Sequence, residues 1–317
     1  MTKKLFSLLL TAALLLALCA CGAVPSVSEA GPTVVVTIFP IYDWVAELCR
    51  DVDGVDITLL MDSGVDMHSF QPSAAEIMTV ASCDLFIYVG GESDAWAEDA
   101  LAEAVNPDMI VLDLMDLLGD RAVEEELTEG MTGEAEDDPE NDEHVWLSLR
   151  NAQLFCGAIA EALAALDPAN ASVYAANAVS YGAELALLDE EYRDVVDSAA
   201  FDTLLFADRF PFRYLTEDYD LTYYAAFAGC SAETEASFET VAFLSGRLAE
   251  LGLPAILVID GSDGRIAETI ADSAEADVPL LTLDSMQAVN ARDIASGASY
   301  LGIMEQNLAV LETALNG

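Results

Sequence analysis

The chain has 317 residues, 54% of them hydrophobic, so it is long enough for two domains and apolar enough to fold. It carries 57 acidic and 11 basic residues, a formal net charge of −46. Such a surface repels nucleic acid and anionic lipid, whose binding depends on Lys and Arg, and it attracts cations. Nucleic-acid binding is therefore excluded, and most of these carboxylates are interpreted as a soluble surface without a specific role.

The first residues predict export and a lipid anchor. Lys3 and Lys4 precede an apolar run over residues 5–18, which is too short to span a membrane comfortably. The run ends in LCACG, and small residues before Cys21 resemble the lipobox of bacterial lipoproteins. We expect a signal peptide over residues 1–20 and lipid on the Cys21 thiol, with an ordinary secretory signal as the alternative. The mature protein is then extracytoplasmic and anchored to the cell membrane.

In the first half of the chain, short apolar runs alternate with helical stretches. Strands are predicted at residues 33–39, 55–61, 85–89 and 109–112. Helices are predicted from Tyr42 and over residues 73–81, where Ser73 is a suitable N-cap. This order of elements favours a parallel sheet covered by helices.

An acidic segment and a long helix follow. Eleven of the twenty residues 124–143 are acidic and none is basic, which is typical of a solvated loop. Helical periodicity returns at Asn151. Asp167 and Pro168 indicate the N-cap and first position of a helix that continues to about residue 199. A helix of about 30 residues spans about 45 Å, so it is interpreted as a rigid connector.

A second α/β series completes the chain. Strands are predicted at residues 203–206, 255–259 and 280–283, and helices at residues 237–251, 265–273 and 299–315. The predicted fold class is α/β, with two lobes, each a mostly parallel sheet flanked by helices, joined by one long rigid backbone helix. The predicted organisation is signal peptide 1–20, tether 21–32, N-terminal metal-binding lobe 33–166, connecting helix 167–199 and C-terminal metal-binding lobe 200–317.

The chain contains only two histidines, His68 and His144. His68 lies just past a predicted strand, and loops beyond the carboxyl ends of strands form the ligand crevice of open α/β sheets. His144 lies where the acidic segment returns to ordered structure. A single loop histidine is usually an ordinary polar residue, but histidine is also the commonest metal ligand. Both residues are therefore candidate ligands.

Three aspartates end or follow predicted strands: Asp208, Asp260 and Asp284. Each could instead cap the next helix. Two histidines and two aspartates that converge from strand ends would form a four-residue metal site. Besides the lipidated Cys21, four cysteines remain in the predicted mature chain, at positions 49, 83, 156 and 230. No CxxC occurs, so a thiolate zinc site is not expected, and no disulfide pairing is assigned.

Several motifs together resemble those of one family. Residues 64–72 read GVDMHSFQP, residues 143–147 read EHVWL, residues 207–212 read ADRFPF, and Asp284 follows a predicted strand. Over nearly all of its mature length the chain resembles the zinc and manganese class of bacterial ABC-transporter solute-binding proteins. The first two motifs are similar to that family's first and second ligand motifs, and the third to its third-ligand region.

The resemblance implies a metal held in the cleft between two lobes, with His68 and His144 from the first lobe and Asp208 and Asp284 from the second. The family's third ligand is His or Glu, a position that is Ala207 here, so Asp208 is expected to replace it. Asp260 stays an open candidate. Two imidazoles with two carboxylates shift the preference toward manganese, but zinc accepts the same donors, so Zn²⁺ and Mn²⁺ both stay open.

The predicted function follows from these features. We expect the substrate-binding component of a metal ABC transporter, a monomer with a lipid anchor that captures Zn²⁺ or Mn²⁺ and delivers it to the membrane permease. One alternative is a surface adhesion or partner-binding lipoprotein. The other is a metal-dependent hydrolase, which is disfavoured because no HExxH or comparable motif is present. No enzyme activity is expected.

Overall fold

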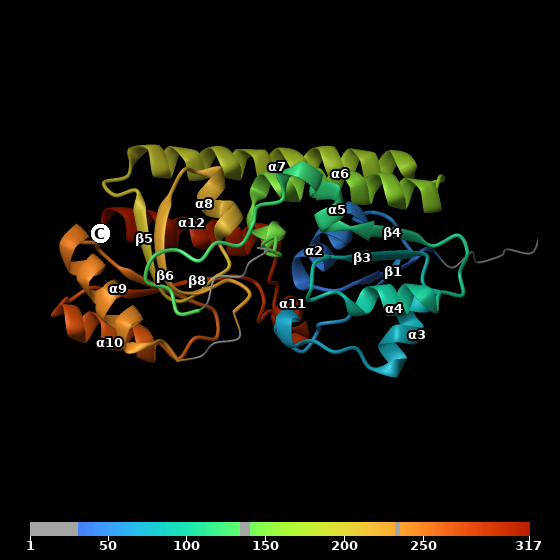
Figure 1. Cartoon of the computed structure of the whole chain (residues 1–317). Helices are drawn as coiled ribbons and strands as arrows, with labels where there is room; N and C mark the ends of the chain where they lie inside the picture. Colours follow the sequence, from blue (N-terminus) through green and yellow to red (C-terminus); the bar gives the residue numbers. More distant parts are fainter. Residues whose placement is uncertain (1–30, 134–139, 232–234) are drawn as a thin grey trace, which may run out of the picture. The chain divides into compact units, whose positions relative to one another are not determined.

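The computed structural model describes residues 31–133, 140–231 and 235–317. The predicted signal peptide and lipidation site, Cys21, lie outside these residues. Residues 31–317 form one compact unit, and within it the chain folds as two α/β lobes, as predicted (Figure 1). None of the helices in the described part is both long and apolar enough to cross a membrane.

The first lobe contains a parallel four-stranded sheet with the strand order β2-β1-β3-β4. Its strands are β1 (Thr33–Val36), β2 (Asp56–Leu59), β3 (Leu85–Tyr88) and β4 (Ile110–Asp113). Its helices are α2 (Phe39–Leu48), α3 (Ala74–Ser82), α4 (Trp96–Ala102) and α5 (Leu114–Leu118), with short 3₁₀ turns η1 (Met67–Ser69), η2 (Gly119–Arg121) and η3 (Val145–Leu147). The four predicted strands are confirmed, as is Ser73, which forms a reciprocal capping box with Glu76.

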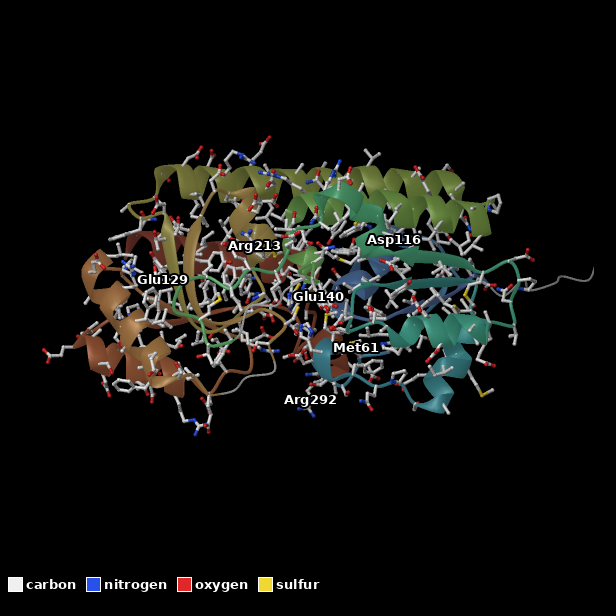
Figure 2. All side chains as sticks on the ribbon, in the orientation of Figure 1. Met61, Asp116, Glu129, Glu140, Arg213 and Arg292 are labelled. Atoms are coloured by element: carbon white, nitrogen blue, oxygen red, sulfur yellow. The ribbon has the colours of Figure 1, made fainter. Side chains whose placement is uncertain are left out.

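The acidic segment is less exposed than predicted. Residues 124–133 pass over the second lobe, where Glu129 is 3.6 Å from Arg247 and Glu126 is 3.3 Å from Arg213 (Figure 2). The prediction of a solvated loop is wrong for Asp142 and Glu143, which are 1% and 4% exposed. The acidic segment therefore begins as a charged surface loop on the second lobe and ends with two buried carboxylates, Asp142 and Glu143.

Two long helices follow, α6 (Leu149–Leu166) and α7 (Ala171–Ser198). The predicted connector is confirmed as α7, a helix of 28 residues that runs along both lobes (Figure 1). Its first half is fixed to the first lobe by Asn177, which donates to the carbonyl of Leu48, and its second half to the second lobe by Tyr192, which donates to Met304. Asp167 does not cap α7 as predicted, because it ends α6.

The second lobe repeats the architecture with the strand order β6-β5-β7-β8, again parallel. Its strands are β5 (Thr203–Phe210), β6 (Thr222–Ala228), β7 (Ile256–Ile259) and β8 (Leu280–Leu283). Its helices are α8 (Arg213–Asp218), α9 (Phe238–Leu251), α10 (Arg265–Ala274), α11 (Ala291–Ala295) and α12 (Tyr300–Asn316). Strand β6 and helix α8 were not predicted. Strand β5 extends to Phe210, so Asp208 lies inside a strand, at a register shift, rather than after it.

One continuous apolar core links the two sheets to the long helices. Trp44 of α2 packs edge-on against Tyr300 of α12, with ring centroids 5.2 Å apart, and both are fully buried. Burial of such side chains contributes about 1.5–3 kcal/mol each. In both sheets the strand order reverses beside the central strand, at β1/β3 and at β5/β7. Open α/β sheets bind ligands beyond the carboxyl ends of strands at such points.

Candidate metal centre

His68 is positioned by a short turn that the sequence builds locally. The Asp66 carboxylate accepts a hydrogen bond from the His68 backbone N–H at 3.0 Å and so caps the 3₁₀ turn η1. The buried side chain of Met67 anchors this turn in the core. Gly64 has φ +72°, and a Cβ there would lie 2.7 Å from the carbonyl oxygen of Ala288. Only glycine permits this approach between the two loops.

His144 is completely buried at the end of the acidic segment. Asp142 Oδ1 accepts the His144 backbone N–H at 2.8 Å and lies 3.0 Å from ring Nδ1. On the other side, a Cβ on Gly229 would lie 3.1 Å from His144 Cε1. Trp146 fixes the following turn by donating its indole N–H to the carbonyl of Ser285 at 2.9 Å. The ring therefore has one orientation and one carboxylate partner.

The two imidazoles face each other through their Nε2 atoms, which are 3.2 Å apart. Nδ1 of His68 lies 2.8 Å from Ser93 Oγ, and Nδ1 of His144 lies beside Asp142. When each Nδ1–H donates to its oxygen, both Nε2 lone pairs point at one place. Two Zn–N bonds of about 2.0–2.1 Å at a tetrahedral angle separate the nitrogens by about 3.3 Å. The observed pair has this spacing.

Electrostatics keeps His68 in the form that binds metal. Burial lowers the pKa of His68 to about 3, helped by the neighbouring His144 and Arg209 and opposed by Asp66. The ring is therefore neutral at physiological pH, and with its proton on Nδ1, toward Ser93, the lone pair is on Nε2. Glu143 Oε2 lies 3.6 Å from His68 Nδ1, and burial raises the pKa of this carboxyl group.

Cys230 is the third group at this point. In the described part of the chain, one group of three potential ligands is close together: His68, His144 and Cys230, whose ligand atoms all lie within 4.8 Å of one another. Cys230 follows strand β6 after Gly229, and its backbone N–H donates to Glu125 Oε1 at 2.7 Å. The sequence interpretation did not identify Cys230, because β6 was not recognised and no CxxC motif marks the thiol.

The sulfur of Cys230 lies in an acidic environment. Burial raises the pKa of its thiol, and the negative charges of Asp142, Glu125 and Glu143 raise it further, while a hydrogen bond from the Glu143 backbone favours the thiolate. The four cysteines of the described residues, at positions 49, 83, 156 and 230, are all free thiols.

The two predicted aspartates lie outside this group of three. Asp208 lines a cavity that His68 also lines. Its Oδ1 accepts the backbone N–H of Arg209 at 2.9 Å. Asp284 Oδ1 accepts the backbone N–H of Met286 at 2.7 Å, and burial, followed by the charge of Asp260, raises its pKa to about 6. Asp260 itself holds the β8 loop, because Oδ1 accepts both the N–H and the hydroxyl of Ser285.

The cavity has a volume of about 800 Å³ and walls from both lobes, including His68, Asp208 and Gln287. Arg209 of β5 pairs across it with Asp66 at 2.5 Å. Burial opposes ionisation of Asp66, but Arg209, and after it His68, hold the pKa of that carboxyl below its usual range. With its amide nitrogen toward Asp66, Gln287 donates to that carboxylate, and its amide oxygen lies 3.2 Å from His144 Nε2. Second-lobe side chains thus contact both histidine loops.

Fold and site together define a two-lobed metal-binding protein. Residues 34–314 match the protein family described as "Zinc-uptake complex component A periplasmic". The chain belongs to this family of extracytoplasmic solute-binding transport components.

Individual relatives agree with this assignment. The chain is 29% identical to the high-affinity zinc uptake system protein ZnuA of Bacillus subtilis, over 99% of both chains. It is 27% identical to the zinc-binding lipoprotein AdcA of Streptococcus pneumoniae, but spans only 60% of that protein's length. The crystal structure of the metal-dependent lipoprotein YcdH from Bacillus subtilis superposes with a TM-score of 0.73 at 26% identity and covers 90% of this chain and 99% of that one.

Proposed function

We propose that this protein is the substrate-binding component of a metal ABC transporter, which captures a divalent transition metal, Zn²⁺ or Mn²⁺, between its lobes. The single observation that carries the proposal is the His68–His144 pair. The two imidazoles present their Nε2 atoms 3.2 Å apart, and each ring has an oxygen within hydrogen-bonding distance of Nδ1. Buried lone pairs that face each other at this distance are stabilised by a shared cation.

Asp208 and Asp284 complete the proposed site as carboxylate ligands from the second lobe. Asp208 borders the cavity, and Asp284 begins the loop that reaches the His144 turn through Ser285. Asp208 lies within β5 and Asp284 directly follows β8, two strands of the same parallel sheet. The excess of 46 negative charges supports capture, because it raises the local concentration of cations.

Delivery and anchoring are part of the same proposal. A component of this kind hands its metal to a membrane permease, and the lipobox-like sequence at Cys21 would hold it at the membrane as a lipid-anchored monomer. The buried imidazole pair favours metal capture over the adhesion and hydrolase alternatives. An adhesive surface has no need of buried, oriented imidazoles, and hydrolysis requires an open metal position with a general base.

Metal titration tests this function. The purified protein, stripped of metal with a chelator, is expected to bind Zn²⁺ and Mn²⁺ in competition assays, and His68→Ala and His144→Ala are each expected to weaken Zn²⁺ binding by about 100-fold or more. Asp197→Ala is the control, because Asp197 is exposed on α7 and outside the site. If both histidine variants bind as tightly as this control, the proposal is wrong.

A further inference from the structure

We propose that the Cys230 thiolate, rather than Asp208, is the third metal ligand, so that the site has a His₂Cys donor set and selects Zn²⁺ over Mn²⁺. This inference rests on the proposed function and names its cargo. It depends on the group of His68, His144 and Cys230, whose ligand atoms lie within 4.8 Å of one another.

The three ligand atoms of the group are close to the spacing of three corners of a tetrahedral site. With Zn–S of about 2.3 Å and Zn–N of about 2.0–2.1 Å, tetrahedral angles separate sulfur from nitrogen by about 3.6 Å. The imidazole nitrogens already have the required spacing, and the sulfur needs to approach by about 1 Å at most. Rotation about the Cα–Cβ bond of Cys230 moves the sulfur on this scale.

The backbone around Cys230 is shaped for this approach. A Cβ on Gly229 would lie 2.8 Å from the carbonyl oxygen of Phe210 and 3.1 Å from His144 Cε1, so only glycine lets this loop pass the ring. The Cys230 backbone N–H is held by Glu125 Oε1 at 2.7 Å. Cys230 therefore lies at a strand end with its backbone fixed on both sides.

Strand β5, which pairs with β6, carries the positively charged Arg209 on the side of the sheet that faces the first histidine loop. The Arg209 guanidinium forms an ion pair with Asp66 at 2.5 Å. This pair connects the loop that carries His68 to β5. A guanidinium at this position repels a metal ion. We therefore do not expect the third metal ligand to come from β5. Strand β6, its partner in the sheet, supplies the sulfur instead.

The donor set determines the expected metal. Thiolate is a soft ligand that favours Zn²⁺, whereas Mn²⁺ prefers carboxylate, carbonyl and water oxygens and has the lowest affinity in the divalent series. A coordinating thiol is deprotonated by the metal, which also offsets the negative charges of Asp142 and Glu143 nearby. A thiolate in place of the Asp208 carboxylate therefore narrows the expected cargo from Zn²⁺ or Mn²⁺ to Zn²⁺.

Cobalt substitution tests the sulfur ligand directly. Co²⁺ added to the metal-free protein is expected to give a near-ultraviolet thiolate-to-cobalt charge-transfer band together with visible bands of a tetrahedral site. Cys230→Ala and the near-isosteric Cys230→Ser are expected to lose the charge-transfer band, to bind Zn²⁺ at least about 10- to 100-fold more weakly, and to lose most of the preference for Zn²⁺ over Mn²⁺. Cys83→Ala, which removes a buried thiol beside β3, is the control.

The outcomes separate this inference from the function it rests on. If Co²⁺ and Zn²⁺ bind in a manner that needs His68 and His144, but no charge-transfer band appears and Cys230→Ala keeps full affinity, the sulfur ligand is overturned and metal capture stands. If binding is independent of both histidines, both proposals fail. Thermal unfolding of each variant verifies that a loss of binding is not a loss of fold.

Discussion

The two lobes contribute to the proposed metal centre in different ways. In the first lobe each histidine follows an aspartate by two residues, and that aspartate holds it: Asp66 accepts from the His68 backbone, and Asp142 contacts both the backbone and the ring of His144. These contacts are local, so the same Asp-x-His spacing holds the histidine backbone twice. For His144 the same aspartate also orients the ring, whereas the ring of His68 is oriented by Ser93.

In the second lobe no such local unit exists. Cys230, Asp208 and Asp284 reach the cavity region only because β6, β5 and β8 are neighbours or near neighbours in one parallel sheet. Their positions depend on strand length and register, and β5 shifts register between Phe206 and Arg209. The position of a ligand from the second lobe therefore depends on tertiary structure. Variants of these residues test the part of the proposed ligand set that local sequence does not support.

The largest effect within this comparison is expected from the group that orients His144. Asp142→Asn replaces a buried carboxylate by an amide of the same shape and weakens the preference for the Nδ1–H tautomer. We expect Zn²⁺ affinity to fall by about 10- to 100-fold. Ser93→Ala, which removes the hydroxyl beside His68, is expected to cost less because that oxygen is uncharged. Equal losses in calorimetric titrations would contradict this difference between the two rings.

A smaller effect is expected from the second-lobe carboxylates. Asp284→Asn is expected to lower Zn²⁺ affinity by about 10-fold, because its loop contacts the His144 turn through Ser285. Asp208→Asn is expected to change it less, since one oxygen of Asp208 already accepts the next backbone N–H. Competition with a chromogenic chelator measures both. The reverse ranking would make Asp208 the fourth ligand and disqualify Asp284.

Most of the fold could be predicted from the sequence, and the reason for the exceptions is specific. Buried parallel strands are read from continuous apolar runs, and seven of the eight strands have them. Strand β6 reads TYYAAFA, and its alanines have low strand propensity. It is stabilised by its pairing with β5, which no local pattern shows. Since β6 leads directly to Cys230, missing the strand also concealed the thiol.

In the candidate site, too, some residues could be identified from local sequence and others only from the folded structure. The histidines could be identified because they are the only two in the chain and lie next to predicted ordered elements. Asp208 was predicted to follow β5 because the polar pair Asp208-Arg209 interrupts the apolar run, yet the strand continues through a register shift to Phe210. The hydrogen-bond partner of His68, Ser93, lies 25 residues away and joins it only through the folded sheet.

A modest effect is expected from the pair that joins the lobes across the cavity. Arg209→Met removes the ion pair with Asp66, whose side chains are 22% and 24% exposed, and is expected to destabilise the metal-free protein by about 1 kcal/mol. Thermal unfolding should show the loss, and high salt should reduce it. Arg265→Met is the control, because its pair with Asp263 is largely exposed and its removal is expected to change almost nothing. Identical shifts for both variants would mean that the lobe-spanning pair is an ordinary surface contact.

The smallest effect concerns Asp94, which is buried beside the β3 end and accepts the backbone N–H groups of Val89 and Gly90. Burial raises the pKa of this carboxyl to about 7, above the unfolded value of 3.8. Between these values the folded state holds a proton that the unfolded chain has lost, so this stabilisation decreases as pH rises and is absent above pH 7. Asp94→Asn removes the titration and keeps an acceptor oxygen.

The melting temperature of Asp94→Asn relative to the parent is therefore expected to increase from pH 5 to pH 8, by about 2–4 °C for each kcal/mol of charge burial relieved. Asp263→Asn serves as the control, because the pKa of that exposed carboxyl is lowered rather than raised, chiefly by a hydrogen bond from the Arg265 backbone. A difference in melting temperature that stays constant between the two pH values would show that Asp94 is ionised throughout. The first lobe would then carry a buried charge in the loop that supports Ser93 and, through it, His68.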